Sequence, residues 1–316
     1  MIRLVIDTDP GVDDSHALMM AFAHPDAKVE AITTVFGNVD VEQTTANART
    51  VLDVLGIPPE QTPIFPGADR ALYSERYSGS YFHGQDGLGN SNFPRSTRRV
   101  EKEHAALALI RLANEAPGEL TLVAIAPLTN IALATRLEPA LPKKYKRLVV
   151  MGGAIHGTGN NRINPSAEFN VYSDPEAAAI VFDMWHGLSL ISWETTLDQL
   201  LSAEQIDELM RAATPRGEFF RRITGHVLSH VTARFGRRAL SSPDPLAMAV
   251  ALEPDIVTRS ELRAVTVELA GKHTRGQTTV DWSNYTGQAP NVDVILDINP
   301  LRFFELMQAA VGLENL

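Results

Sequence analysis

The sequence predicts an α/β fold with a mostly parallel central sheet and helices on both faces. Short apolar runs typical of strands alternate with longer helix-forming segments, beginning with residues 2–7, 13–23, 28–35 and 41–55. The strand-like runs are continuously apolar, as is typical of parallel strands that are covered on both sides. We therefore expect a sheet that lies between two layers of helices.

The same alternation continues to about residue 192. It predicts a helix at 102–115, a strand at 119–125, a helix from Thr129, a strand at 147–151, a helix after Pro175 and a strand near 188–192. The last third predicts a small additional region of neighbouring strands and a closing helix, at 261–269, 277–283, 291–297 and 301–312. Residues 66–99 predict a long loop, which is often functional. With neither a repeat nor a linker, residues 1–316 are expected to form a single domain.

The composition excludes several classes of function. The chain has 316 residues, no cysteine and a net charge of −10. Disulfides, thiolate nucleophiles and thiolate–metal sites are therefore impossible. An acidic surface repels nucleic acids and anionic membranes, so we expect neither as a partner. The N-terminal segment does not resemble a secretion signal, and no apolar run approaches the roughly 20 residues that span a bilayer, so a cytoplasmic location is expected.

The residues after the first predicted strand are the strongest candidate site. Asp7, Asp9, Asp13 and Asp14 place four carboxyl groups within eight residues. Two unit charges about 4 Å apart repel by roughly 4 kcal/mol at an effective dielectric constant near 20. A hard divalent cation such as Ca²⁺ or Mg²⁺ is the simplest compensation, because it prefers oxygen ligands. The alternative, helix caps and solvated turn residues, fits a single Asp better than three acids around a Pro-Gly turn.

Other polar residues follow other strand-like runs, and the carboxyl ends of parallel strands meet at one edge of a sheet. Asn38 follows the second run, and Glu168 and Asn170 follow a Gly-rich segment. A surface turn is an equal alternative for the last two. Asp244, between two prolines, is by itself better explained as a helix N-cap than as a ligand. His83 lies in the long loop, where a lone histidine is more often structural.

Several motifs occur in a specific order along nearly the whole chain. The first is Asp-Thr-Asp-Pro-Gly-Val-Asp-Asp at 7–14. The others are Ile-Thr-Thr-Val-Phe-Gly-Asn at 32–38, Pro-Leu-Thr-Asn-Ile-Ala at 127–132, Met-Gly-Gly at 151–153, Ala-Glu-Phe-Asn at 167–170, Ser-Asp-Pro-Glu-Ala at 173–177 and Asp-Pro at 244–245. Together they resemble the inosine–uridine-preferring nucleoside hydrolases. The resemblance implies a Rossmann-like α/β fold and hydrolysis of the N-glycosidic bond of ribonucleosides to ribose and free base.

The resemblance also implies a Ca²⁺ site. Its ligands would be the side chains of Asp9, Asp14 and Asp244 and the backbone carbonyl of Ile125, and Asp9 would be the general base for a metal-bound water. The residues implied to bind ribose are Asp13, Asn38, Asn160, Glu168, Asn170 and Asp244, with Asn161 and Asn164 as alternatives to Asn160. These residues suit the reaction, because cleavage of a ribosyl C–N bond passes through an oxocarbenium-like state that carboxylates stabilise.

Two positions depart from the family pattern. Pro243 stands where many relatives have a histidine, a candidate leaving-group acid, and proline cannot donate a proton. His83 matches a family histidine in the long loop and is the best remaining side chain for that role. The loop at 157–164 is slightly longer than usual, and Arg162 adds a charge that could meet a polar or anionic group of the substrate.

Some features of the sequence also fit functions other than a ribonucleoside hydrolase. Pro243 and the altered loop favour a modified nucleoside or another N-riboside as the substrate. A non-catalytic ribonucleoside-binding protein fits less well, because binding alone needs no general base. An aspartyl-phosphate phosphotransferase shares only the Asp-x-Asp start, and a redox function is disfavoured because no GxGxxG motif follows a strand.

The base preference is expected to depend on residues 75–90 and on a helix near 220–240. Tyr81, Phe82 and Phe235 are candidates to stack on a base there, although packing in the core explains them equally well. The resemblance implies a homodimer or a homotetramer without selecting between them.

Overall fold

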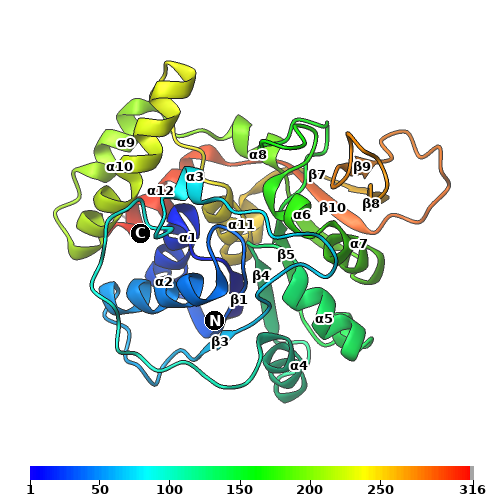
Figure 1. Ribbon diagram of the computed structural model, residues 1–316, viewed down its shortest axis with the longest axis horizontal. Helices are drawn as coiled ribbons and strands as arrows, with labels where there is room; N and C mark the ends of the chain where they lie inside the picture. Colours follow the sequence, from blue (N-terminus) through cyan, green and yellow to red (C-terminus); the bar gives the residue numbers. More distant parts are fainter. Residues whose placement is uncertain (314–316) are drawn as a thin grey trace.

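The computed structural model describes residues 1–313 and has an eight-stranded central sheet (Figure 1). The strand order is β3-β2-β1-β4-β5-β6-β10-β7, and every neighbouring pair is parallel except β10 with β7. The strands are β1 (Ile2–Thr8), β2 (Ala27–Thr34), β3 (Ile64–Pro66), β4 (Leu120–Ala124), β5 (Arg147–Met151), β6 (Leu188–Ile191), β7 (Val257–Arg263) and β10 (Val292–Ile298). The predicted Rossmann-like, mostly parallel sheet is confirmed, because its 3-2-1-4-5-6 part has the order of doubly wound folds.

Helices cover both faces of the sheet, because successive side chains of a strand point to opposite sides. In β1, Leu4 and Ile6 belong to the core of one face and Val5 to the core of the other. The first face is covered by α1 (Val12–Ala23), α2 (Val41–Val54), α9 (Ala203–Met210), α10 (Pro215–Phe235), α11 (Pro243–Leu252) and α12 (Pro300–Ala310). The second is covered by α4 (Ala105–Glu115), α5 (Thr129–Leu137) and α7 (Pro175–Met184). Three short helices lie in connections: α3 (Ser80–His83), α6 (Phe169–Ser173) and α8 (Trp193–Asp198).

The C-terminal strands differ from the prediction of a separate small region. β10, predicted at 291–297, lies in the main sheet parallel to β6, and β7 pairs with it antiparallel at the edge. The strand predicted at 261–269 breaks at Ala264, so only β8 (Val265–Val267) and β9 (Thr278–Val280) form a second sheet. The prediction that these runs are neighbours is correct for β7 with β10 and for β8 with β9. It missed that β10 also joins the main sheet beside β6, because local pattern does not identify a partner that lies far away in the sequence.

Two predicted boundaries also change. The long loop at 66–99 is irregular apart from the four residues of α3, and β3 precedes it as a strand that the sequence did not predict. The helix expected at 102–115 begins at Ala105 instead. His104 is its N-cap, with extended backbone and an Nδ1 atom that accepts the N–H of Ala106 at 3.2 Å.

The long helix α10 crosses one side of the molecule and frames the site described below. It begins after Thr214, whose side chain accepts the N–H of Gly217, and ends at Gly236 in the left-handed conformation with φ 66°. Phe219 and Phe220 are buried in the core, and Arg222 is exposed. Within residues 1–313, neither this helix nor any other is long and apolar enough to cross a membrane.

Candidate active site

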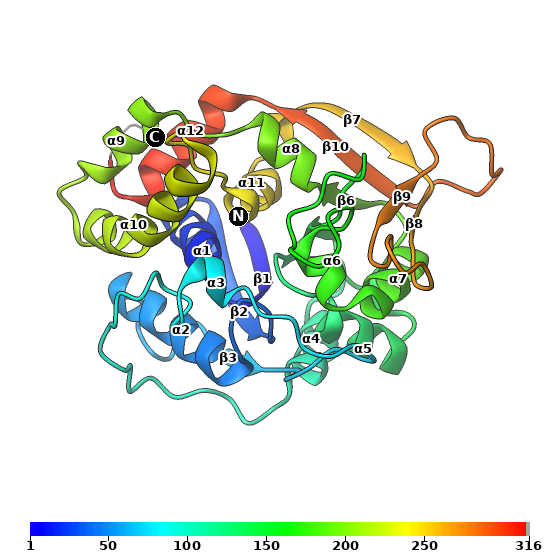
Figure 2. The same cartoon turned by 45° about the horizontal axis from the view of Figure 1, so that its top comes forward.

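The candidate site lies where the strand order reverses. β1 has β2 on one side and β4 on the other. Ligands of open α/β sheets bind at such a reversal, because the neighbouring connections leave toward opposite faces and open a crevice. The carboxyl ends of these strands lead to Asp9, Asn38 and Ile125. Figure 2 shows α3 beside α1 and α10 at this edge of the sheet.

Asp14 is held by four donors at the start of α1. Its Oδ1 accepts the hydroxyl of Thr8 at 2.6 Å and the N–H of Asp9 at 3.2 Å. Its Oδ2 accepts the N–H of Gly11 and the side-chain amide of Asn38, both at 2.9 Å. The positive end of the helix dipole also favours an acid in this first turn. The Asp14 carboxyl group is therefore fixed in one orientation.

Asp9 keeps one oxygen free. Its Oδ2 accepts the N–H of Asn38 at 2.7 Å, but its buried Oδ1 has no hydrogen-bond partner. Gly37 makes the close approach possible, because a Cβ atom at this position would lie 1.9 Å from Asp9 Oδ2. Oδ1 of Asp9 is thus available to a ligand or a water molecule.

Asp244 reaches the same place from the start of α11. The N-cap interpretation of Asp244 is wrong, because the N-cap is Ser242 and it makes no side-chain cap bond. Pro243 takes the first helical position, where a missing N–H costs no helical hydrogen bond. One oxygen each of Asp13, Asp14 and Asp244 lie within 4.8 Å of one another. The turn before α11 therefore delivers a carboxylate to the site.

Burial raises the pKa of each carboxyl group in this cluster, and repulsion from neighbouring acids adds to the rise for Asp9, Asp14 and Asp244. Burial raises the pKa of Asp13 to about 6 and that of Asp14 to about 6. The pKa of Asp9 lies well above its usual range because of burial and then the charge of Asp14. Burial and the charge of Asp13 act in the same way on the pKa of Asp244. The four groups together therefore favour either bound protons or a bound cation.

The donor set fits a hard cation. Oδ1 of Asp9 and Oδ1 of Asp13 are buried without a hydrogen-bond partner. The carbonyl of Ile125 also accepts no hydrogen bond from residues 1–313, although its N–H is used. Unsatisfied buried oxygens are costly, and Ca²⁺ or Mg²⁺ would satisfy them. The predicted ligands Asp14 and Asp244 belong to the closest carboxylate group, which has Asp13 rather than Asp9 as its third member.

Glu168 and Asn170 are buried instead of forming a surface turn. Glu168 is the N-cap of α6, and its Oε1 accepts the N–H of Asn170 at 2.8 Å. Its Oε2 accepts the N–H of Gly153 at 3.0 Å and that of Val171 at 3.1 Å. Burial, with a smaller contribution from the charge of Asp13, raises the pKa of Glu168 to about 7. Glu168 therefore lies close enough to the Asp cluster to interact with its charge.

The structure distinguishes the three asparagines of the 157–164 loop. Asn161 donates to the carbonyl of Ala167 at 2.7 Å and accepts the N–H of Asn164 at 2.6 Å. The side chain of Asn164 donates to a backbone carbonyl in the segment before β9. The side-chain oxygen of Asn160 instead accepts the N–H of Phe169 at 2.7 Å, between Glu168 and Asn170. Asn160 is thus linked directly to the site, while the other two hold the shape of the loop.

His83 closes one side of the cluster as an uncharged ring. Its Nδ1 accepts the N–H of Val12 at 3.2 Å and lies 3.6 Å from Oδ1 of Asp13. The bond to Val12 assigns the ring hydrogen to Nε2. Burial lowers the pKa of His83 to about 4. Near neutral pH, the ring can therefore donate a hydrogen bond from Nε2 but holds no extra proton.

Asp7 does not join the other acids, which the sequence did not reveal. Its Oδ1 accepts the hydroxyl of Thr33 at 2.5 Å and the side-chain amide of Asn130 at 2.9 Å. Asn130 also donates to the carbonyl of Thr34 at 3.0 Å and so connects α5 with β1 and β2. Burial raises the pKa of Asp7 to about 7. Asp7 thus has a structural role that supports the turn. The sequence pointed to Asp7 only through its place in the Asp-rich motif, which does not distinguish this role from that of the other acids.

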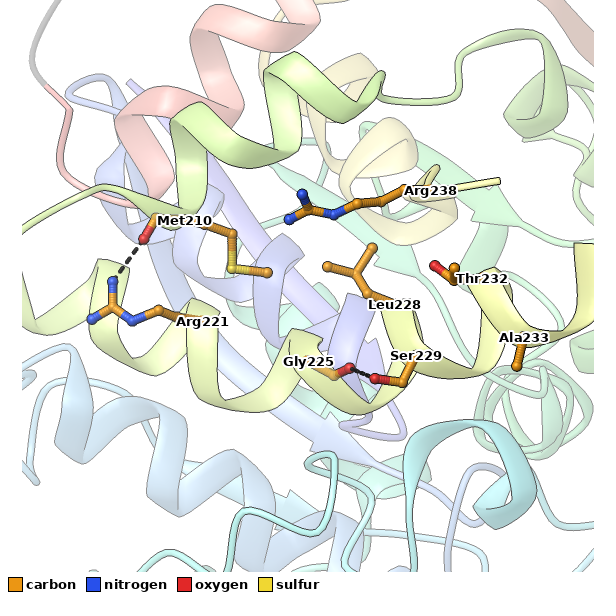
Figure 3. A pocket seen from close by; sticks show the side chains of 8 residues that line it. All are labelled: Met210, Arg221, Gly225, Leu228, Ser229, Thr232, Ala233 and Arg238. Atoms are coloured by element: carbon orange, nitrogen blue, oxygen red, sulfur yellow. Dashed lines mark hydrogen bonds between the residues drawn. The ribbon is translucent and has the colours of Figure 1, made fainter. Parts of the chain in front are cut away.

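An open groove of about 550 Å³ lies between α9 and α10 (Figure 3). Arg221 donates to the carbonyl of Met210 at 2.7 Å along it, and Arg238 pairs with Asp207. Its lining residues are Met210, Arg221, Gly225, Leu228, Ser229, Thr232, Ala233 and Arg238. The acids of the cluster are not among them, so this groove is separate from the candidate active site.

Comparison with known proteins places this site in a family. The sequence pattern of the inosine-uridine preferring nucleoside hydrolases matches residues 4–305, nearly the whole chain. The chain belongs to this family. The match covers Asp9 and Asn38 after their strands and Asp244 at the start of α11, so this nucleoside hydrolase is an N-glycosidic bond hydrolase.

The names of individual relatives of this nucleoside hydrolase give different nucleobases for their substrates. It is 36% identical over 299 residues to a probable uridine nucleosidase 2 of Oryza sativa subsp. japonica. This alignment covers 91% of this chain and 87% of that protein. It is 32% identical over 309 residues to the pyrimidine-specific ribonucleoside hydrolase RihB of Escherichia coli, covering 98% and 96%. A solved inosine–guanosine nucleoside hydrolase superposes with a TM-score of 0.90 at 34% identity and covers 99% of each chain.

Proposed function

We propose that this nucleoside hydrolase binds the ribosyl end of a ribonucleoside in the acid cluster and releases ribose and free base. The convergence of Asp13, Asp14 and Asp244 within 4.8 Å beside Glu168, with Asp14 and Asp244 buried and Asp13 half-buried, carries the proposal. Such a pocket offers many acceptor oxygens for sugar hydroxyl groups. The same oxygens favour positive charge on the sugar, which develops when the C–N bond breaks.

Ca²⁺ is the proposed resident cation of the site. Asp9, Asp14, Asp244 and the carbonyl of Ile125 would hold it through oxygen atoms, as this ion prefers. When bound, such a cation lowers the pKa of a coordinated water and orients it. Asp9 is the proposed general base, and its free Oδ1 is the atom that accepts the proton of the attacking water.

The chain's own groups then hold the sugar. The proposed ribose-binding residues are Asp13, Asn38, Asn160, Glu168, Asn170 and Asp244. Three backbone N–H groups accepted by Glu168 keep its carboxylate in place, so it is oriented before the substrate binds. Hydrogen bonds that become stronger as the ribosyl group gains positive charge raise kcat rather than affinity alone.

Position 243 cannot protonate the leaving base, because proline has no proton to donate. His83 is the proposed neighbour of the leaving group, and it offers a hydrogen bond from Nε2 because burial lowers its pKa to about 4. A hydrogen bond assists the departure of a base less than full protonation does. A base that leaves readily as an anion therefore suits this site, and Pro243 favours a modified nucleoside or another N-riboside as the second candidate substrate.

An assay of ribose release from purine and pyrimidine ribonucleosides tests the proposal. The Asp9→Ala variant is the inactive control, and the metal content of both proteins is measured. Ribose release by the wild type alone supports the Asp9 mechanism, and the panel ranks the bases. Bound metal without cleavage of any nucleoside would remove the substrate assignment, and well-folded protein with neither metal nor activity would overturn the whole proposal.

We also propose a cytoplasmic location and a homodimer or homotetramer. The acidic composition without cysteine motivates the first. Family resemblance motivates the second, and the molar mass of the purified protein in solution distinguishes a dimer from a tetramer. A monomeric mass at working concentration would contradict it.

A further inference from the structure

A group of basic side chains beside the acid cluster has no role in the proposed reaction. His226, His230 and Arg234 follow one another at four-residue spacing and so share one face of α10. This face is directed toward α3, because the ring of His230 meets Phe82 edge-on with the ring centroids 5.6 Å apart. Arg162 joins them from the 157–164 loop, because its guanidinium lies over the ring of Tyr81, the residue before Phe82. We call these four residues the basic rim.

Arg162 and Arg234 both lie near the side chain of Tyr81. The guanidinium of Arg162 lies over the Tyr81 ring at 3.9 Å, and its backbone N–H donates to the hydroxyl of Tyr77 at 3.0 Å. Burial raises the pKa of Tyr81, and the positive charges of Arg162 and Arg234 both act against this rise. Within residues 1–313, neither arginine forms an ion pair. Both guanidinium groups therefore remain available to an anion.

The segments that carry the rim also carry residues of the site. Tyr81 and His83 both belong to the single turn of α3. Arg162 follows Asn160 by two residues, and the side chain of Asn160 accepts the N–H of Phe169 next to Glu168. Arg162 and the ring on which it stacks therefore lie on the same two segments as Asn160 and His83. The site is thus acidic at one end and cationic at the other.

We propose that the basic rim, through Arg162 and Arg234, recognises an anionic group of the substrate, so that this hydrolase prefers N-ribosides with a negative charge away from the scissile bond. The proposal rests on the proposed function. A guanidinium forms charge-assisted and often bidentate hydrogen bonds with a carboxylate or a phosphate. It also offsets the repulsion that an anionic substrate meets in a chain of net charge −10.

The anion can be carried by the base or by the 5′ position of the ribose, and matched substrates separate the two. Uridine is compared with orotidine, and inosine with xanthosine at a pH where its base is anionic. Uridine and inosine are also compared with their 5′-monophosphates. The enzymes are the wild type, Arg162→Gln and Arg234→Gln. Arg216→Gln is the control, because it removes the same charge from α10 about 27 Å away from Arg234 along the helix axis.

We expect the wild type to have a higher kcat/KM for the anionic substrate than for its neutral partner, either in the pairs that differ in the base or in the pairs that differ in the 5′-phosphate. Arg162→Gln and Arg234→Gln each lower that kcat/KM about tenfold and change the value for the neutral nucleoside less than about twofold. The preference weakens as salt is added. A preference for the anionic bases places the anion on the base, and one for the monophosphates places it at the 5′ position.

Two results would overturn this inference. Equal losses for neutral and anionic substrates in both variants would mean that Arg162 only stacks on Tyr81. A wild-type enzyme that cleaves uridine or inosine but prefers none of their anionic partners would also rule it out, while leaving the proposed function intact. Failure of the metal-loaded enzyme to cleave any riboside is a different result, because it removes the proposed function itself.

Discussion

The backbone N–H of Asn38 donates to Oδ2 of Asp9 at 2.7 Å, and this bond determines which oxygen of Asp9 stays free. The side-chain amide of Asn38 also donates to the carbonyl of Asp9 at 3.0 Å and to Oδ2 of Asp14 at 2.9 Å. One residue at the end of β2 thus orients two acids that follow β1. The hydrogen bond from the segment after the neighbouring strand thus leaves Oδ1 of Asp9 without a partner.

Asp9→Asn is expected to lower kcat at least about a thousandfold, which is within the range for loss of a general base. The amide oxygen still accepts the N–H of Asn38, so the fold and the melting temperature should change little. Steady-state ribose release and thermal unfolding measure the two effects. Asp26→Asn is the control, since Asp26 is exposed on a turn between α1 and β2. A variant that keeps a tenth of the wild-type kcat would exclude Asp9 as the base.

Asp244→Asn is expected to weaken Ca²⁺ binding and the stabilisation that comes with it. A ligand that binds only the folded state stabilises by about 2.7 kcal/mol at a hundredfold excess over its Kd. Added Ca²⁺ should therefore raise the Tm of the metal-free wild type, and raise that of the variant less at the same concentration. Asp255→Asn, at an exposed position beyond α11, should respond like the wild type. Equal shifts in wild type and Asp244→Asn would remove Asp244 from the ligands.

The parallel part of the fold was predictable because its signals are local. Apolar runs mark the strands β1, β2, β4, β5 and β6, helical segments connect them, and such connections place successive strands parallel in one sheet. The position of β10 was not predictable in this way. It pairs with β6 across a long stretch of helices and loops, and its own pattern fits an edge hairpin equally well.

The site was predictable where several acids occur close together, and not where its members come from different segments. The Asp9–Asp14 motif predicted a common site because like charges need a shared counterion. Asp244 alone has the pattern of a helix cap, and only the packing of α11 against α1 brings it beside Asp13 and Asp14. The contact of Arg162 with Tyr81 joins two irregular segments, whose relative position follows no sequence period.

Gly37→Ala is expected to destabilise the protein by about 1–3 kcal/mol, the usual cost of forcing extra volume into a packed site. The added Cβ atom would lie 1.9 Å from Oδ2 of Asp9 and 3.1 Å from the ring of Pro127, so the proposed base must move. We expect kcat to fall as well. Gly225→Ala is the matched control, because no atom lies within 4 Å of its added Cβ atom. That change should stabilise α10 by about 0.5–1 kcal/mol.

The ion pair of Glu253 with Arg302 predicts an acid-dependent part of the stability. Hydrogen bonds from Arg302, at 2.6 and 2.8 Å, lower the pKa of Glu253 from its ordinary value of 4.5. A pKa that is lower in the folded state stabilises the fold above the ordinary value, and this contribution is lost as the pH falls through the folded value. Glu253→Gln should therefore reduce the free energy of unfolding by about 1 kcal/mol near pH 7 and by much less near pH 3.

Urea unfolding at both pH values measures the difference, with Glu60→Gln at an exposed loop position as the control. A loss that is equal at both pH values would show that Glu253 acts through packing and not through its charge.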